Sequence, residues 1–192
     1  LYFKWLYPDA IIYTFEPDKR TFDLLEKNIQ LNGFHDILCF NQAVGQTNGT
    51  TQFYVDLENP GSWIMSTREG RVRRATSTTV AMRTVSSVIL EHGITAVSLL
   101  KLDVEGSEWD VLSDLHRNGS LGQVQKAIVE YHHHIGNDPG RLGSFLSRCE
   151  SSGFEYQINA PFVPVCRDDR FQDVLIYLYR SSGSDPDIGN PA

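Results

Sequence analysis

Residues 11–17 read Ile-Ile-Tyr-Thr-Phe-Glu-Pro, a β-branched and aromatic run that ends at a carboxylate followed by proline. Such a run predicts a buried strand that ends at Glu16, at the carboxyl edge of a sheet. Ligands of doubly wound α/β folds bind at that edge, where an acidic residue after the second strand commonly accepts hydrogen bonds from a ribose diol. Glu16 is therefore a candidate for nucleoside binding, with a helix N-cap role as the alternative.

The glycine-rich turn for the other end of such a ligand is expected upstream of this acid. That turn normally lies roughly 20 residues before the acidic residue. Residues 1–8 contain no glycine, and counting back from Glu16 passes the start of the sequence. We therefore expect the first strand and the glycine-rich loop of the fold to be missing from the N-terminus.

The rest of the chain alternates strand-like and helix-like segments. Asp18 is the expected N-cap of a helix that ends at Asn32-Gly33. Further strands are predicted at 37–40, 50–55, 78–83, 97–103, 127–131, 154–158 and 174–179. Further helices are predicted at 141–151 and, after Glu105-Gly106, through Trp109, Leu112 and Leu115. This alternation predicts an α/β fold with a doubly wound, mainly parallel, Rossmann-like sheet. We expect one domain over residues 1–180 and a disordered tail at 181–192, which is rich in Ser, Gly, Asp and Pro.

Composition narrows the classes of partner and compartment. The formal net charge of -7 argues against non-specific binding to nucleic acid. No apolar run is long enough to span a bilayer, so no membrane association is expected. Three cysteines without metal-type spacing indicate a reducing compartment, and the expected location is cytoplasmic.

A second strand also ends in a carboxylate, at Asp103. Lys101 and Glu105 lie two residues to either side of it, on the same face if the strand continues. We expect Asp103 to point into the ligand cleft. The alternatives are an internal ion-pair network of these three residues, or a magnesium ion held by Asp103 and Glu105.

The strand at 127–131 leads into Glu130-Tyr131-His132-His133-His134. Glu130 and His132 are expected to share one face of the strand. Because histidine titrates near neutrality, His132 is the preferred proton acceptor. Chelation of a metal by the three histidines, and exposed loop histidines without a role, are the alternatives.

Four blocks of sequence together carry a family resemblance. They are Tyr-Thr-Phe-Glu-Pro-Asp at 13–18, Leu-Leu-Glu-Lys-Asn-Ile-Gln-Leu-Asn-Gly at 24–33, Ala-Val-Gly at 43–45, and Leu-Lys-Leu-Asp-Val-Glu-Gly-Ser-Glu-Trp-Asp-Val-Leu at 100–112. In these blocks the chain resembles the FkbM-type S-adenosylmethionine-dependent methyltransferases. The resemblance implies a class I methyltransferase fold with S-adenosyl-L-methionine as cofactor. It also implies methyl transfer to a hydroxyl group on a sugar, a lipid-linked glycan or a polyketide-like secondary metabolite.

The resemblance also assigns roles within the site. It implies that Glu16 binds the ribose, and that the segment Asn41, Gln42 and Ala43 lies near the adenine ring, a simple turn being the alternative. Asp103 would face the amino acid moiety of the cofactor or the acceptor, and His132 with Glu130 the acceptor side. The expected partner is then a small-molecule or glycan substrate, and no residue is assigned as a metal ligand.

Two other functions stay open at this level. A nicotinamide-dependent oxidoreductase also carries an acid after its second strand. A non-catalytic binding or scaffold domain of the same fold is the third possibility.

The sequence also contains a basic cluster of four arginines, Arg68, Arg71, Arg73 and Arg74. This cluster is either a loop that folds over an anionic substrate or a solvated loop.

Overall fold

The computed structural model describes residues 1–56, 65–72, 75–135, 140–161 and 172–181. Of the expected tail at 181–192, residues 182–192 lie outside these ranges, as do Arg73, Arg74 and Cys166. The first half of the chain forms α1 (Tyr2–Leu6), β1 (Ile12–Phe15), α2 (Lys19–Leu31), β2 (Ile37–Phe40), β3 (Ala43–Val44), β4 (Gly49–Asp56), β5 (Ala75–Arg83) and α3 (Val85–Glu91). The second half forms β6 (Leu100–Leu102), α4 (Glu108–Arg117), η1 (Ser120–Gln123), β7 (Lys126–His133), α5 (Leu142–Ser151), β8 (Glu155–Asn159) and β9 (Gln172–Tyr179).

The strands form mixed sheets rather than one mainly parallel sheet. Among the described residues, β1 pairs with β2, the order β3-β5-β4 makes a second sheet, and the order β6-β7-β9-β8 makes a third. The pairs β1-β2, β3-β5 and β6-β7 are parallel, whereas β4-β5, β7-β9 and β8-β9 are antiparallel. The α/β class is confirmed and the mainly parallel arrangement is corrected. Side-chain alternation predicts where strands lie, but the connections between them decide their direction.

Several element boundaries also differ from the sequence expectation. The strand expected at 97–103 is shorter, because β6 spans only Leu100–Leu102 and Val97 makes a single isolated bridge to Val124. Asp18 is confirmed as the N-cap of α2, and its side chain accepts the Thr21 N–H at 2.9 Å. Helix α3 was not predicted, and Thr84 caps it by accepting the Ser87 N–H at 3.2 Å.

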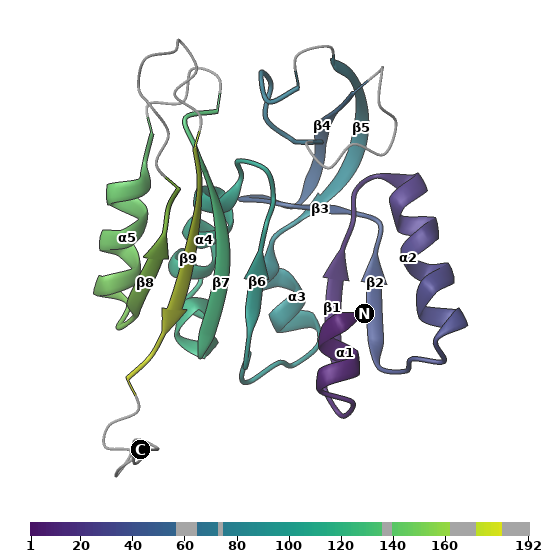
Figure 1. Ribbon diagram of the computed structural model, residues 1–192, viewed down its shortest axis with the longest axis horizontal. Helices are drawn as coiled ribbons and strands as arrows, with labels where there is room; N and C mark the ends of the chain where they lie inside the picture. Colours follow the sequence, from purple (N-terminus) through teal and green to yellow (C-terminus); the bar gives the residue numbers. More distant parts are fainter. Residues whose placement is uncertain (57–64, 73–74, 136–139, 162–171, 182–192) are drawn as a thin grey trace.

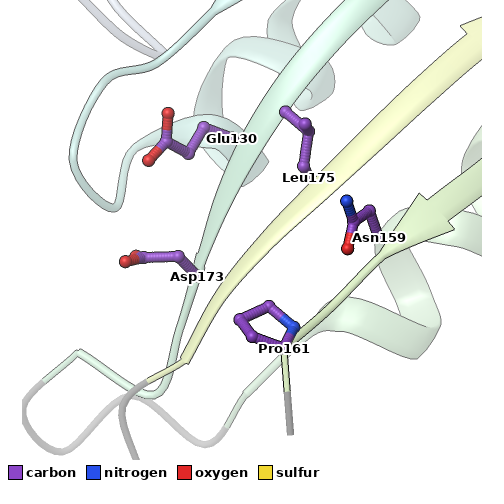
Figure 2. Close-up of a pocket in the computed structure, with 5 residues that line it drawn as sticks. All are labelled: Glu130, Asn159, Pro161, Asp173 and Leu175. Carbon is purple, nitrogen blue, oxygen red and sulfur yellow. The ribbon is translucent and has the colours of Figure 1, made fainter.

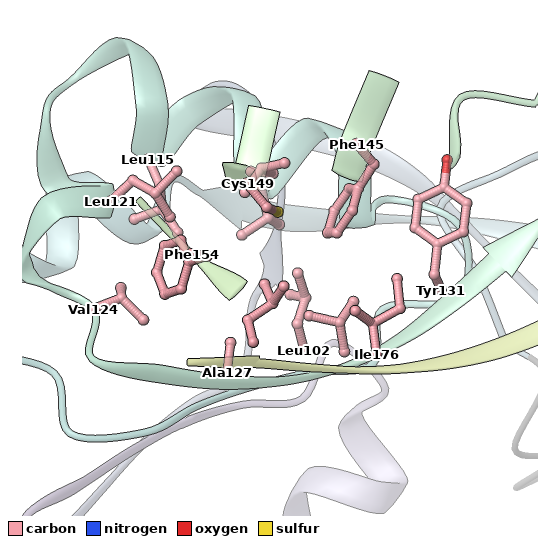
Figure 3. Packing of buried hydrophobic residues seen from close by; sticks show 14 of the residues in the cluster. Leu102, Leu115, Leu121, Val124, Ala127, Tyr131, Phe145, Cys149, Phe154 and Ile176 are labelled. Carbon is pink, nitrogen blue, oxygen red and sulfur yellow. The ribbon is translucent and has the colours of Figure 1, made fainter. Parts of the chain in front are cut away.

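The main core lies between the β6-β7-β9-β8 sheet and the helices α4 and α5 (Figure 3). Its residues on the strands include Leu102, Ala127, Val129 and Ile176, and those on the helical side include Leu115, Phe145, Cys149 and Phe154. Because alternate residues of a strand face opposite sides, this packing turns Glu130 and His132 to the other face of β7. The packing of the apolar face of β7 therefore fixes the side of the sheet on which Glu130 and His132 lie.

Figure 1 shows the strands side by side, with β4 and β5 beyond the carboxyl end of β1. Among the described residues, no helix is both long and apolar enough to cross a membrane.

Cys39 and Cys149 are free thiols, and burial raises the pKa of the Cys149 thiol to about 12.

Candidate functional site

Polar side chains from β6, β7 and β9 meet at one edge of the third sheet. Strands β6 and β7 are parallel, with Leu102 opposite Val129, so both chains leave the sheet at the same edge. Lys101 Nζ lies 2.9 Å from Asp103 Oδ2 and 3.9 Å from Glu130 Oε2. His132 Nε2 lies 3.9 Å from Asp103 Oδ1. The structure therefore brings the predicted residues Asp103, Glu130 and His132 together. Of the alternative ion-pair network, the Lys101–Asp103 pair is present, whereas Glu105 pairs with Arg71.

The turn after β6 adds a further carboxylate to this cluster. Glu105 has φ 51° and Gly106 has φ 105°, both in the left-handed half of backbone space. This conformation carries the Glu105 side chain toward the sheet, where its Oε2 lies 3.2 Å from His132 Nε2. Glu105 Oε2 also accepts a hydrogen bond from Arg71 Nε at 2.7 Å.

The segment at 65–72 is tied to this turn by side-chain hydrogen bonds. Ser66 Oγ donates to the Glu105 carbonyl at 2.5 Å, and Arg68 Nε donates to the Gly106 carbonyl at 3.1 Å. Arg68 also pairs with Asp110 at 2.6 Å. Arg68 and Arg71 are the two described arginines of the basic cluster. Both pair with carboxylates of their own chain, unlike the side chains of a solvated loop.

Glu108 was not predicted as a site residue, yet it lies directly behind His132. Both side chains are only 1% exposed, and Glu108 Oε1 lies 2.7 Å from His132 Nδ1. The same oxygen accepts the Gly106 N–H at 3.0 Å. The only available signal was an acid in the first turn of a helix, three residues after Glu105, and surface helices commonly begin in that way.

The carboxylates around His132 affect its ionisation. Burial of the imidazole disfavours its charged form, but the hydrogen bond and charge of Glu108, with the charges of Glu105 and Asp173, outweigh burial and raise the pKa of His132. Burial also raises the pKa of Glu105, against the opposing effect of His132 and Arg71. Burial and the nearby Asp103 charge raise the pKa of Glu130. Because these groups lie so close together, the proton affinity of each depends on the charge of the others.

A cavity of about 390 Å³ opens beside the cluster (Figure 2). Its lining residues are Glu130, Asn159, Pro161, Asp173 and Leu175. Asp173 lies opposite His132 in the β7-β9 ladder, and its Oδ1 is 3.8 Å from His132 Nε2. Figure 2 shows the carboxylates of Glu130 and Asp173 extending to the same side. Asp173 and Asn159 are residues that the sequence pattern did not single out.

Glu16 lies at the carboxyl end of β1, where its N–H donates to the Phe40 carbonyl at 3.0 Å. Its Oε1 accepts the Asp18 N–H at 2.8 Å. No hydrogen bond to its Oε2 occurs among the described residues. Burial raises the pKa of Glu16, although the Asp18 N–H opposes the shift. Because Asp18 caps α2, the alternative N-cap role does not belong to Glu16.

The three residues expected near an adenine ring differ in their surroundings. Asn41 Nδ2 donates to the carbonyls of Glu16 at 2.8 Å and Pro17 at 3.1 Å, so it braces the turn after β1. Gln42 Oε1 is buried and has no partner among the described residues. Ala43 is 3% exposed and lies in β3, where it pairs with Met82 of β5, so it belongs to a strand rather than to a turn.

Within the described part of the chain, two groups of side chains have ligand atoms close enough to contact one cation. Asp103, Glu105 and His132 form one group and Glu130, His132 and Asp173 the other, with the ligand atoms of each group within 4.8 Å of one another. Neither group includes His133 or His134, contrary to the chelation alternative. Lys101 and Arg71 already pair with the carboxylates of Asp103 and Glu105.

Comparison with solved structures shows the fold. The chain is similar to the crystal structure of methyltransferase FkbM from Methylobacillus flagellatus KT, with a TM-score of 0.51 and 17% identity. The match covers 87% of this chain and 36% of that one.

Comparison with protein sequences shows the family. "Methyltransferase 1" of Beauveria bassiana (strain ARSEF 2860) is 23% identical, over 84% of this chain and 69% of that protein. "Methyltransferase sdnD" of Sordaria araneosa is 27% identical, over 68% of this chain and 60% of that protein. The family description "Methyltransferase FkbM domain" matches residues 3–156. The chain therefore belongs to the FkbM methyltransferase domain family.

Proposed function

We propose that this chain is an S-adenosylmethionine-dependent methyltransferase that methylates a hydroxyl group of a sugar, glycan or secondary metabolite. Family membership supports methyl transfer. The observation that carries the proposal is the half-buried Glu16 carboxylate at the carboxyl end of β1. Asp18 holds one of its oxygens, and Asn41 braces the turn behind it. A carboxylate held in this way suits bidentate hydrogen bonding to a ribose diol.

A second polar group supports the fit of the cofactor. Gln42 Oε1 is buried without a partner among the described residues, and a buried acceptor left unsatisfied is unfavourable. A donor such as the exocyclic amino group of adenine would satisfy it. Glu16 and Gln42 are therefore the residues of this chain that would hold the nucleoside.

Methyl transfer is an in-line displacement, so the protein must chiefly align the acceptor. The bound cofactor supplies a methyl group that its sulfonium has already activated. His132 Nε2 takes the proton of the acceptor hydroxyl, because Nδ1 is occupied by Glu108. Asp103 is the weaker candidate for the base, since its carboxylate is paired with Lys101 at 2.9 Å. Asp103 and Glu130 instead accept hydrogen bonds from further hydroxyls.

The charge around the cavity favours a neutral acceptor with several hydroxyl groups. The carboxylates of Asp103 and Asp173 lie 3.9 Å and 3.8 Å from His132 Nε2. The ligand atoms of Glu130, His132 and Asp173 lie within 4.8 Å of one another, and Lys101 pairs with Asp103 and Glu130. Arg68 and Arg71 are engaged in ion pairs of their own. A phosphorylated acceptor would meet like charge here, so we propose a sugar, glycan or metabolite without phosphate.

Calorimetry with S-adenosylhomocysteine tests the proposal on the intact protein. Replacing Glu16 by alanine should weaken binding by roughly 1.5–3 kcal/mol, the range of hydrogen bonds to charged groups. Glu26→Ala removes an exposed carboxylate of α2 and should leave the affinity unchanged. Equal affinities of Glu16→Ala and the wild type, with both folded, would remove Glu16 from the site. Binding of a nicotinamide cofactor instead would favour an oxidoreductase, and binding of neither a scaffold domain.

A further inference from the structure

We propose that Glu108 is a positioning residue for His132: its buried carboxylate selects the imidazole tautomer and holds Nε2 toward the acceptor. The inference rests on the proposed function, in which His132 takes the acceptor proton. It adds a residue that makes no contact with the acceptor itself and acts through the imidazole.

The tautomer follows from the chemistry of the two partners. An ionised carboxylate can only accept hydrogen bonds, so His132 Nδ1 must carry the proton that spans the 2.7 Å to Glu108 Oε1. Nε2 of the neutral ring then carries the lone pair and is the atom that can take a proton. Each ring nitrogen faces a carboxylate oxygen, Nδ1 at 2.7 Å from Glu108 and Nε2 at 3.2 Å from Glu105. The neutral ring keeps its proton on Nδ1 because the Glu108 contact is the shorter one and is 1% exposed, whereas Glu105 is 14% exposed and already accepts a hydrogen bond from Arg71.

Two further local features surround the buried Glu108 carboxylate with hydrogen-bond donors. Its Oε1 accepts a backbone hydrogen bond from Gly106 at 3.0 Å, in addition to the one from His132. It is also the first residue of the ten-residue helix α4, where the backbone N–H groups favour negative charge. The hydrogen bond to Gly106 joins the imidazole to the turn that carries Glu105.

Further charged groups face Nε2 from the other side of the ring. Glu105 Oε2 lies at 3.2 Å, Asp173 Oδ1 at 3.8 Å and Asp103 Oδ1 at 3.9 Å. Arg71 pairs with Glu105, and Lys101 with Asp103 and Glu130. When Nε2 gains a proton, the charged imidazole therefore has Asp103, Glu105 and Asp173 near Nε2 and Glu108 at Nδ1. Glu108 differs from the carboxylates near Nε2 because its carboxylate is 1% exposed and cannot be screened by solvent.

NMR titration of the imidazole in the intact protein tests this arrangement, with the His132 signal assigned by its loss in His132→Gln. Glu108→Gln keeps an oxygen that can accept both hydrogen bonds but removes the charge. We expect the proton affinity of His132 to fall at least ~10-fold, the scale of one charge-assisted hydrogen bond.

Asp114→Asn is the matched control, because Asp114 is 1% exposed on the same helix and accepts hydrogen bonds from Ser86. It should lower stability and leave the His132 titration in place. An unchanged titration in folded Glu108→Gln would overturn the proposal. If that variant does not fold, the wild type decides: a neutral ring protonated at Nε2 overturns the proposal, and one protonated at Nδ1 supports it. Neither measurement needs cofactor or acceptor, so a failure of methyl transfer would refute the proposed function separately.

Discussion

Gly106 is the residue whose replacement should damage the site most selectively. Its φ of 105° is a conformation that residues with a side chain rarely adopt. A Cβ built at this position would lie 2.5 Å from Ile135 Cδ1 and 3.0 Å from Arg68 Cγ. Ile135 is 7% exposed and cannot move away freely. Gly106→Ala must therefore shift the turn that holds Glu105 against His132.

The expected cost has two parts. Positive φ in a residue with a side chain costs of order 1–3 kcal/mol. Overpacking against a buried side chain adds about 1–3 kcal/mol. Gly119→Ala provides the matched control, because Gly119 has φ 74° but no atom within 4 Å of its added Cβ. The control carries only the conformational cost, so Gly106→Ala should be the more destabilising of the two by at least about 1 kcal/mol.

Urea denaturation measures both variants, and NMR titration of His132 reports the site. We expect Gly106→Ala to lower the free energy of unfolding and to move the His132 titration, since Glu105 and Glu108 both depend on this turn. Gly119→Ala should lower stability alone. Equal destabilisation by the two substitutions would show that the contacts of the added Cβ with Ile135 and Arg68 do not lower the free energy of unfolding. The steric argument for Gly106 would then be wrong.

Two further predictions concern the pH dependence of stability and divalent cations. Because the folded protein raises the pKa of His132 above its ordinary 6.5, His132 stabilises the fold fully below that pH and loses this contribution as pH rises through the folded-state pKa. Each pKa unit by which the folded and unfolded states differ corresponds to about 1.4 kcal/mol of stability. Urea denaturation should show the stability difference between wild type and His132→Gln shrinking from pH 6.5 upward, and a growing difference would contradict the sign. Because Arg71 and Lys101 already pair with Glu105 and Asp103, about 1 mM Mg²⁺ should leave the Tm unchanged. A rise of several degrees that Asp103→Asn abolishes would instead establish a cation site.

Sequence alone predicted the parts of the site that follow from strand ends. A hydrophobic run bounded by a carboxylate indicated Glu16 and Asp103, and alternation along β7 indicated that Glu130 and His132 share a face. These inferences depend on nearest neighbours in the chain, where the geometry of a strand is regular. The same local reasoning predicted Asp18 as the cap of α2.

The contacts that sequence could not predict join segments far apart in the chain. Glu108 and His132 are 24 residues apart, and Arg71 and Glu105 are 34 apart. Nothing in an Arg-rich segment or in the first turn of a helix identifies its ion partner. The direction of β9 was equally hidden, and it is this antiparallel strand that places Asp173 opposite His132.

The charge balance of the cluster bears on what its titration would report. In the described residues, the carboxylates of Asp103, Glu105, Glu108, Glu130 and Asp173 surround His132, whereas the cations paired within the cluster are Lys101 and Arg71. One further proton therefore lowers an excess of negative charge, which suits the proposed role of the site in taking the proton of an acceptor hydroxyl. Because the pKa of Glu105 is also raised and its Oε2 lies 3.2 Å from Nε2, we expect the two side chains to titrate as a coupled pair. The pH profile of methyl transfer should consequently follow the His132–Glu105 pair. Arg71→Gln removes a cation that lowers the pKa of Glu105, so it should move that profile to higher pH.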